Sequence, residues 1–302
     1  MIDYRHAGRL PDKPHTTHRD PDGALLYEEC FTRDGFDGPF SILYHARPPQ
    51  FHGEGQLVAP PWPERREAAP LEQTPLRRRH LDSVQADEAG TPTTARLPLA
   101  FNADVTIGVA RPTSDDHHYF ANGDGDDLFY IHAGSGTLLS PFGRLVFGQG
   151  DYLLVPRSVP HRIVLGSGPQ HWLWLECRSG LRTPTQYRNP VGQLRMDAPY
   201  SHRDFRAPEF DPASAIDELP ITTVITQRAG RFTRHEYASP VLDTVGWDGT
   251  VYPFVFPISR FSPKIGQVHL PPTVHGTFAT RGSLVCSFVP RVTDFHENAI
   301  PC

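Results

Sequence analysis

Several histidines and carboxylates in this chain are of the types that bind metal ions or move protons. Among those that are adjacent in the sequence are His117-His118 and His296-Glu297. Successive side chains of a strand point to opposite faces, so the two members of such a pair do not readily bind one ion together. His269 and His275 lie beside prolines in QVHLPPTVHGTF, which indicates a loop. An imidazole has a pKa near neutral pH, so either could serve as a general base.

The other reactive side chains give weaker signals. The basic run RRRH at residues 77–80 has no aromatic or glycine-rich neighbour, which favours a solvated face over a phosphate site. The four cysteines form no CxxC pair, so we expect reduced thiols and neither a disulfide framework nor a zinc site. They are Cys30, Cys177, Cys286 and Cys302.

Composition limits the fold and the partners. The chain has 302 residues with 32 Pro and 25 Gly, too many for a helix-rich protein, and its 38% hydrophobic residues are too many for disorder. We therefore expect an all-β fold with long loops rich in proline and glycine. A net charge of -5 gives no reason to expect nucleic acid as a partner. The N-terminus has no apolar signal region and no segment reaches membrane-spanning length, so we expect a cytoplasmic protein without a membrane partner.

The stretch Asp126–His161 predicts the centre of the fold. Short apolar runs alternate there with turns at AGSG, PFG and GQGD, and the last run ends in Pro156, which cannot donate to a ladder. Short strands at this spacing predict a jelly roll or closed barrel. Further strands are predicted at 25–31 and 41–45 as an edge hairpin of the main sheet, and at 97–110, 171–177, 221–227 and 232–237. Residues 4–22 are expected to form an extended surface arm.

This order of strands resembles the cupin barrel. In a metal-binding cupin, two His and a Glu come from a first motif and a further His from a second. Asp127 matches the Glu position and His161 the second-motif His. The remaining first-motif positions fall on Phe120, Ala121, Asn122 and Gly123. One His and one carboxylate do not make the two-His, one-carboxylate set of Fe(II) enzymes. We therefore predict a scaffold barrel in which His161 is half-buried and bonded to backbone.

Three segments after residue 240 resemble the homogentisate 1,2-dioxygenase family. Gly246-Trp247-Asp248-Gly249, followed by Tyr252-Pro253-Phe254, is similar to the segment that joins the family's two barrels. His269-Leu270-Pro271-Pro272-Thr273 resembles an element whose His approaches the substrate ring. Val285–Arg291 resembles a family strand, with Cys286 in place of an acidic residue. With the barrel strands, the resemblance runs from about Tyr4 to the last residue.

The resemblance implies an oxidoreductase that uses Fe(II) and O2 to open the ring of homogentisate, giving maleylacetoacetate in tyrosine and phenylalanine catabolism. His269 is the residue expected to take the proton from the substrate hydroxyl, and the substrate-binding residues stay unknown. The family assembles as trimers that pair into hexamers, so a homo-oligomer is expected. Residues 1–240 would form an N-terminal degenerate cupin-like domain, with a core at about 97–177 and a connector at 48–80. Residues 241–302 would hold the linker and the first strands of a second, incomplete barrel.

The family's iron ligands follow the third segment, and this chain stops at Cys302 before their elements. No metal ligand is therefore carried over, and we expect a fragment that binds no Fe(II) alone and is inactive as it stands. Strands between Leu242 and Pro290 would then lack partners. Two alternatives stay open. The chain could be a non-catalytic cupin that binds a small aromatic acid or only supports assembly, or a cupin enzyme of another kind that uses His161 and Asp127.

Overall fold

The stretch Asp126–His161 folds into consecutive strands with glycines at the turns, as predicted. The computed structural model describes residues 2–35, 37–49, 53–63, 80–211, 222–238, 240–262 and 275–287. The strands of this stretch are β8 (Asp126–Ala133), β9 (Ser135–Ser140), β10 (Gly143–Gly148) and β11 (Asp151–Val155). Gly134 and Gly150 stand at turns with φ of 97° and 83°, a conformation that glycine adopts at little cost.

Two sheets built from these strands and their neighbours form the barrel. The larger has six strands in the order β17-β11-β8-β13-β6-β5, and the smaller has the order β10-β9-β12. Besides those already given, the strands are β5 (Arg96–Phe101), β6 (Val105–Ala110), β12 (Arg162–Leu165), β13 (His171–Cys177) and β17 (Phe254–Pro257). The predicted strand-forming stretch 97–110 is thus a hairpin of β5 and β6. Its turn is stabilised by Asn102, whose Oδ1 accepts the amides of Asp104 and Val105 at 2.8 and 2.9 Å.

Aromatic side chains fill the space between the two sheets. Phe147 of β10 packs edge-on against Trp172 of β13, with ring centroids 5.6 Å apart, and both side chains are fully buried. The all-β, cupin-like jelly-roll fold that the sequence predicts is confirmed. The helices among the described residues are short 3-10 turns: η1 (Ser83–Gln85), η2 (Thr185–Tyr187), η3 (His202–Asp204) and η4 (Ile258–Arg260). None of these turns has the length and apolarity to cross a bilayer.

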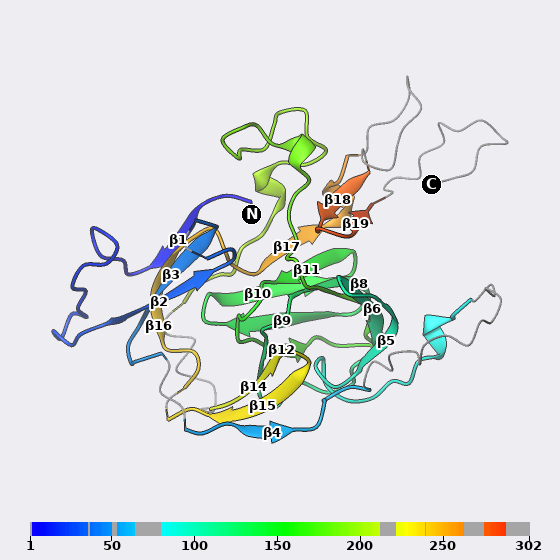
Figure 1. Ribbon diagram of the computed structural model, residues 1–302, viewed down its shortest axis with the longest axis horizontal. Coiled ribbons are helices and arrows are strands. Elements are labelled where there is room, and N and C mark those ends of the chain that lie inside the picture. Colours follow the sequence, from blue (N-terminus) through cyan, green and yellow to red (C-terminus); the bar gives the residue numbers. More distant parts are fainter. Residues whose placement is uncertain are drawn as a thin grey trace.

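Two four-stranded sheets flank the barrel (Figure 1). One has the order β4-β15-β14-β7, from β4 (Gln56–Val58), β7 (Tyr119–Asn122), β14 (Thr223–Arg228) and β15 (Arg231–Glu236). The other has the order β1-β16-β3-β2, from β1 (Arg5–Gly8), β2 (Tyr27–Thr32), β3 (Phe40–His45) and β16 (Thr244–Gly249). The predicted hairpin β2–β3 exists, but its placement in the main sheet was wrong, because β3 pairs with β16 instead. The residues expected to form a surface arm include β1, which pairs with the other side of β16.

The strands that the structure describes after residue 240 have partners, contrary to the expectation from the sequence. β16 lies between β1 and β3, and β17 pairs with β11 in the six-stranded sheet. β18 (Gly276–Ala279) and β19 (Leu284–Cys286) form a two-stranded sheet next to β17 (Figure 1). Phe278 of β18 is fully buried, with ring centroids 5.6 Å from Tyr152 and 6.0 Å from Phe256. These contacts bury Phe278, whereas Leu284 of β19 stays 37% exposed. The domain boundary at residue 240 stays a prediction.

His45 joins β3 to the segment that leads into β16. Its Nδ1 lies 2.7 Å from Asp243 Oδ1, and its Nε2 lies 3.2 Å from Glu29 Oε2. Burial by itself lowers the pKa of His45. The hydrogen bonds to Asp243 and Glu29, together with their charges, outweigh burial and raise the pKa to about 9. The ring is therefore charged at neutral pH and holds the two carboxylates together.

Replacing His45 by Gln should remove a pH-dependent part of the stability. Because the folded pKa is raised, this stabilisation is fully present below the unfolded pKa of about 6.5 and is lost as pH rises through about 9. We expect urea denaturation to show His45→Gln less stable than the parent by about 2 kcal/mol at pH 6, with a much smaller difference at pH 10. The exposed His117→Gln is the matched control. An equal loss at both pH values would contradict this role of the charge.

Candidate functional site

Two adjacent carboxylates at the start of β8 mark the two polar sites of the barrel. Asp126 and Asp127 are each 1% exposed. Since successive residues of a strand point to opposite faces, the two carboxylates contact different groups of residues. Asp126 bonds to the loops at the end of the barrel, through the amides of Arg157 and Leu181. Asp127 faces the interior, where cupins hold their metal.

The interior of the barrel contains a buried arginine. Arg96 is 1% exposed, and its Nη1 lies 3.0 Å from Asp127 Oδ2 in an ion pair whose two side chains are both buried. Its Nε donates to the carbonyl of Pro92 at 3.3 Å. The guanidinium carbon lies 4.9 to 5.1 Å from the centroids of four aromatic rings, those of Trp62, Phe120, Phe129 and Trp174. Ring faces attract a cation electrostatically, so this cage favours a permanent positive charge at the centre of the barrel.

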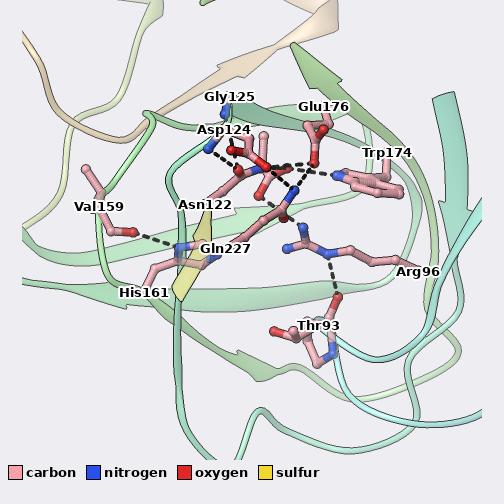
Figure 2. A network of polar contacts seen from close by, with 12 residues as sticks. Thr93, Arg96, Asn122, Asp124, Gly125, Val159, His161, Trp174, Glu176 and Gln227 are labelled. Atoms are coloured by element: carbon pink, nitrogen blue, oxygen red, sulfur yellow. Dashed lines mark hydrogen bonds and ion pairs between the residues drawn. The ribbon is translucent and has the colours of Figure 1, made fainter. Parts of the chain in front are cut away.

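Uncharged N–H groups donate hydrogen bonds to the carboxylates of Asp127 and Glu176 in the interior of the barrel. Asp127 Oδ1 accepts from Trp174 Nε1 at 2.9 Å and from Asn122 Nδ2 at 3.2 Å. Glu176, which is fully buried, accepts at Oε2 from Gln227 Nε2 at 3.0 Å. Figure 2 shows Trp174, Glu176, Gln227 and Asn122 converging above Arg96. Each of these carboxylates is therefore held by N–H donors of the protein.

His161 lies apart from this network. It is 1% exposed, and its Nδ1 lies 3.0 Å from the carbonyl of Val159 (Figure 2). The predicted bond to backbone is confirmed, but the ring is fully buried instead of half-buried. Burial is the largest cause that lowers its pKa, to about 4, and the nearby charge of Arg96 lowers it further. The imidazole is thus neutral at pH 7, and its buried Nε2 has no hydrogen-bond partner among the described residues.

These residues do not fit a ferrous ion. His161 offers one nitrogen, but Asp127 is already paired with Arg96, whose fixed charge would repel a second cation. Phe120 and Ala121 stand at first-motif positions and have no ligand atom in their side chains. No group of three or more His, Cys, Asp or Glu suited to a metal occurs in the described part of the chain. The alternative of a cupin enzyme that uses His161 and Asp127 is therefore not supported.

The remaining sequence candidates are dispersed. His269, His296, Glu297, Cys302 and residues 77–79 lie outside the described residues. His275 is 1% exposed at the start of the β18–β19 hairpin, and its carbonyl accepts the amide of Ser287 at 3.0 Å. His117 is exposed and His118 is half-buried, in a bend and not a strand. Cys30, Cys177 and Cys286 form no disulfide with one another in the described part of the chain.

Sequence reasoning missed Arg96 and its counterpart Arg33, which pairs with Asp126. Arg96 directly precedes the apolar run LPLAF. A single arginine at that position is typical of a strand end that is exposed to solvent. One available signal was the pair Asp126-Asp127 at the head of an apolar strand. Two carboxylates entering a buried strand require two buried counter-charges.

Comparison with known proteins gives matches over the barrel and over the whole chain. The family model described as homogentisate 1,2-dioxygenase N-terminal matches residues 100–258. A protein of Saccharolobus solfataricus named "Putative dioxygenase" is 30% identical over 303 aligned residues, covering 100% of this chain and 76% of that protein. Homogentisate 1,2-dioxygenase of Bradyrhizobium diazoefficiens is 27% identical over 161 residues, which is 53% of this chain and 34% of that enzyme. The chain thus matches only about a third of the length of that enzyme. A solved cupin superfamily protein of Desulfitobacterium hafniense is 22% identical over 27% of this chain and 74% of its own, with a TM-score of 0.25.

Proposed function

Because the chain belongs to the homogentisate 1,2-dioxygenase N-terminal family, we propose that it takes part in the cleavage of the homogentisate ring by O2 to give maleylacetoacetate. The observation that carries this proposal is the family match over residues 100–258, which contains every strand of the barrel except most of β5. The relative named as a dioxygenase, 30% identical over the full chain, supports an oxidoreductase in the same way. The reaction would belong to tyrosine and phenylalanine catabolism.

We assign the described barrel a supporting role in this reaction. Its interior does not fit Fe(II), because the Arg96 guanidinium neutralises Asp127 there. In the family, bound Fe(II) supplies the activation of O2 and of the substrate hydroxyl. The residue of this chain that we propose for chemistry is His269. Its imidazole would accept the proton of the substrate hydroxyl, since its ordinary pKa lies near working pH.

The assembly and location of the protein follow from the family only as proposals. We propose a homo-oligomer, with the trimers and hexamers of the family as the reference, and a cytoplasmic location. Homogentisate and O2 are the proposed small-molecule partners.

A second candidate is a non-catalytic cupin that binds a small aromatic acid or supports assembly only. The observation that favours it is the filled interior of the barrel, where four aromatic rings and Arg96 take the space of a metal site. If this candidate is right, the protein takes up no oxygen in the presence of homogentisate, whichever metal is added. It therefore differs from the first in a measurable way.

The test is oxygen uptake by the protein expressed from its complete reading frame and loaded with ferrous ion. We expect equimolar consumption of homogentisate and O2, and a product heavier than the substrate by both oxygen atoms. 4-Hydroxyphenylacetate, which lacks the pair of para hydroxyls, is the matched control and should give no uptake. Absence of uptake with homogentisate, in a protein that folds and assembles, would reject ring cleavage and leave the second candidate.

A further inference from the structure

A cavity of about 710 Å³ opens at the end of the barrel where β8 begins and where β11 and β13 end. The loop after β2 and the β18–β19 hairpin complete its wall. Five arginines and two carboxylates line it, an excess of three positive charges. These residues are Arg33, Arg157, Arg178, Arg182, Arg281, Asp34 and Asp126. The cavity has the volume of a small-molecule site and lies outside the barrel interior described above.

Both carboxylates of the cavity are already engaged. Asp126 forms an ion pair with Arg33, and its Oδ2 also accepts the amide of Leu181 at 2.7 Å. Its Oδ1 accepts the amide of Arg157 at 2.9 Å. Asp34 Oδ2 accepts from Arg182 Nη2 at 2.7 Å. The two carboxylates therefore neutralise Arg33 and Arg182, and no carboxylate that lines the cavity neutralises the other three guanidinium groups.

Three arginines of the cavity have weak partners or none of opposite charge. Arg157 Nη2 donates to the carbonyl of Arg33 at 2.9 Å, which is a neutral acceptor. Arg178 Nε lies 3.8 Å from Glu176 Oε1, at the limit of an ion pair. No carboxylate pairs with the Arg281 guanidinium within the described ranges, although its amide donates to Ser179 Oγ at 2.9 Å.

The positive charges at the floor of the cavity affect one another. Arg33 is largely buried, and burial is the main cause that lowers its pKa, to about 10; the charges of Arg182 and Arg157 lower it further. Gly180 lets the loop backbone approach this guanidinium, because a Cβ at Gly180 would lie 2.8 Å from Arg33 Nη2. The arginine side chains around the cavity thus outnumber the carboxylates that line it. A bound anion would relieve that repulsion.

We propose that this cavity binds a small anion carrying two or more negative charges on carboxylate or phosphate groups. Arg157, Arg178 and Arg281 would contact it directly, and the pairs Arg33–Asp126 and Arg182–Asp34 would hold the floor and rim. A planar guanidinium matches both oxygens of a carboxylate or phosphate with two parallel N–H bonds, which favours these anions over halides. An anion of charge two or three balances the excess, whereas a monoanion leaves most of it. The site requires neither iron nor homogentisate, so it stands apart from the proposed ring cleavage.

Calorimetric titration of the full protein at physiological salt tests this site, with pyrophosphate, inorganic phosphate and succinate as probes. We expect saturable binding of one probe molecule per chain. R178Q/R281Q removes two exposed guanidinium groups of the cavity. Loss of each charge-assisted contact should weaken binding about tenfold, so the double variant should weaken it about 100-fold. Preference for the phosphates would identify a phosphate ester as the natural ligand, and preference for succinate a dicarboxylate.

A matched variant separates the cavity from general surface charge. R195Q/R231Q removes two exposed arginines outside the cavity and changes the net charge equally. It should bind each probe within about twofold of the parent, because screened surface charges contribute little at this salt. R157Q tests the third direct contact and should weaken binding about tenfold, and thermal melting shows whether the variant folds. The proposal is overturned if no probe binds saturably, or if R178Q/R281Q binds as the parent does, or if both double variants weaken equally.

Discussion

Replacing Arg96 by Met is expected to lower the free energy of unfolding by about 3–5 kcal/mol, because it leaves Asp127 as an unpaired charge inside the barrel. Both side chains are 1% exposed, and the ion pair between Nη1 and Oδ2 measures 3.0 Å. Methionine fills a comparable space among the four aromatic rings, so the loss is attributable to charge more than to a cavity. Urea denaturation at pH 7, followed by circular dichroism, measures the change.

A double variant tests whether the effect comes from the charge pair. R96M/D127N removes both charges, and the amide side chain introduced in place of Asp127 would retain an oxygen that accepts from Trp174 Nε1. We expect it to recover a substantial part of the stability lost in R96M, which appears as a coupling energy in a double-mutant cycle. The exposed R195M is the control and should unfold at the same urea concentration as the parent. A loss below about 1 kcal/mol in R96M would show that Asp127 has another counter-charge.

The second large effect concerns catalysis. Replacing His269 by Ala in the iron-loaded protein expressed from its complete reading frame should lower kcat/KM for homogentisate by about 10²–10⁴-fold, the usual contribution of a general base. The iron content should not change, since His269 is proposed to move a proton and not to hold the metal. Oxygen uptake as a function of homogentisate concentration and pH measures the effect. The acidic limb of the pH profile should be lost together with the rate.

His117→Ala is the matched control, because this histidine is exposed. It should retain kcat/KM within about twofold. If His269→Ala keeps its activity, the proton acceptor is another group, and His275 is the nearest sequence alternative. Loss of iron together with activity would instead make His269 a ligand. Either outcome would contradict the role proposed for it.

The barrel could be predicted from the sequence because its turns are chemically marked. Gly134, Gly143 and Gly150 have positive φ. Gly134 lies between β8 and β9, Gly143 begins β10, and Gly150 lies between β10 and β11. The loss of the first-motif metal ligands could also be read at residues 120–123, since the side chains of Phe120 and Ala121 have no ligand atoms. The turns and the missing ligand atoms both depend on the residue type at single positions, so both could be predicted from the sequence.

The partners of buried charges could not be predicted in this way. Arg96 and Asp127 are 31 residues apart and come from strands on different parts of the sheet. Alternation along β8 predicts that Asp126 and Asp127 diverge, but not which arginine each will meet. The strand order β1-β16-β3-β2 could not be predicted either. The pattern of apolar residues predicts that a strand exists, but it does not predict which strand is its neighbour. Tertiary packing supplies that choice.

The insertion of β16 between β1 and β3 imposes an order on folding during synthesis. His45 of β3 and Asp243, which precedes β16, are 198 residues apart. At translation rates of about 5–20 residues per second, β3 waits roughly 10–40 s for the strand that covers its edge. Ile42 and Leu43, which are almost completely buried in the finished protein, meet solvent during that interval. Exposed apolar surface of this kind favours aggregation, so we expect the yield of soluble protein to rise when chaperones are co-expressed.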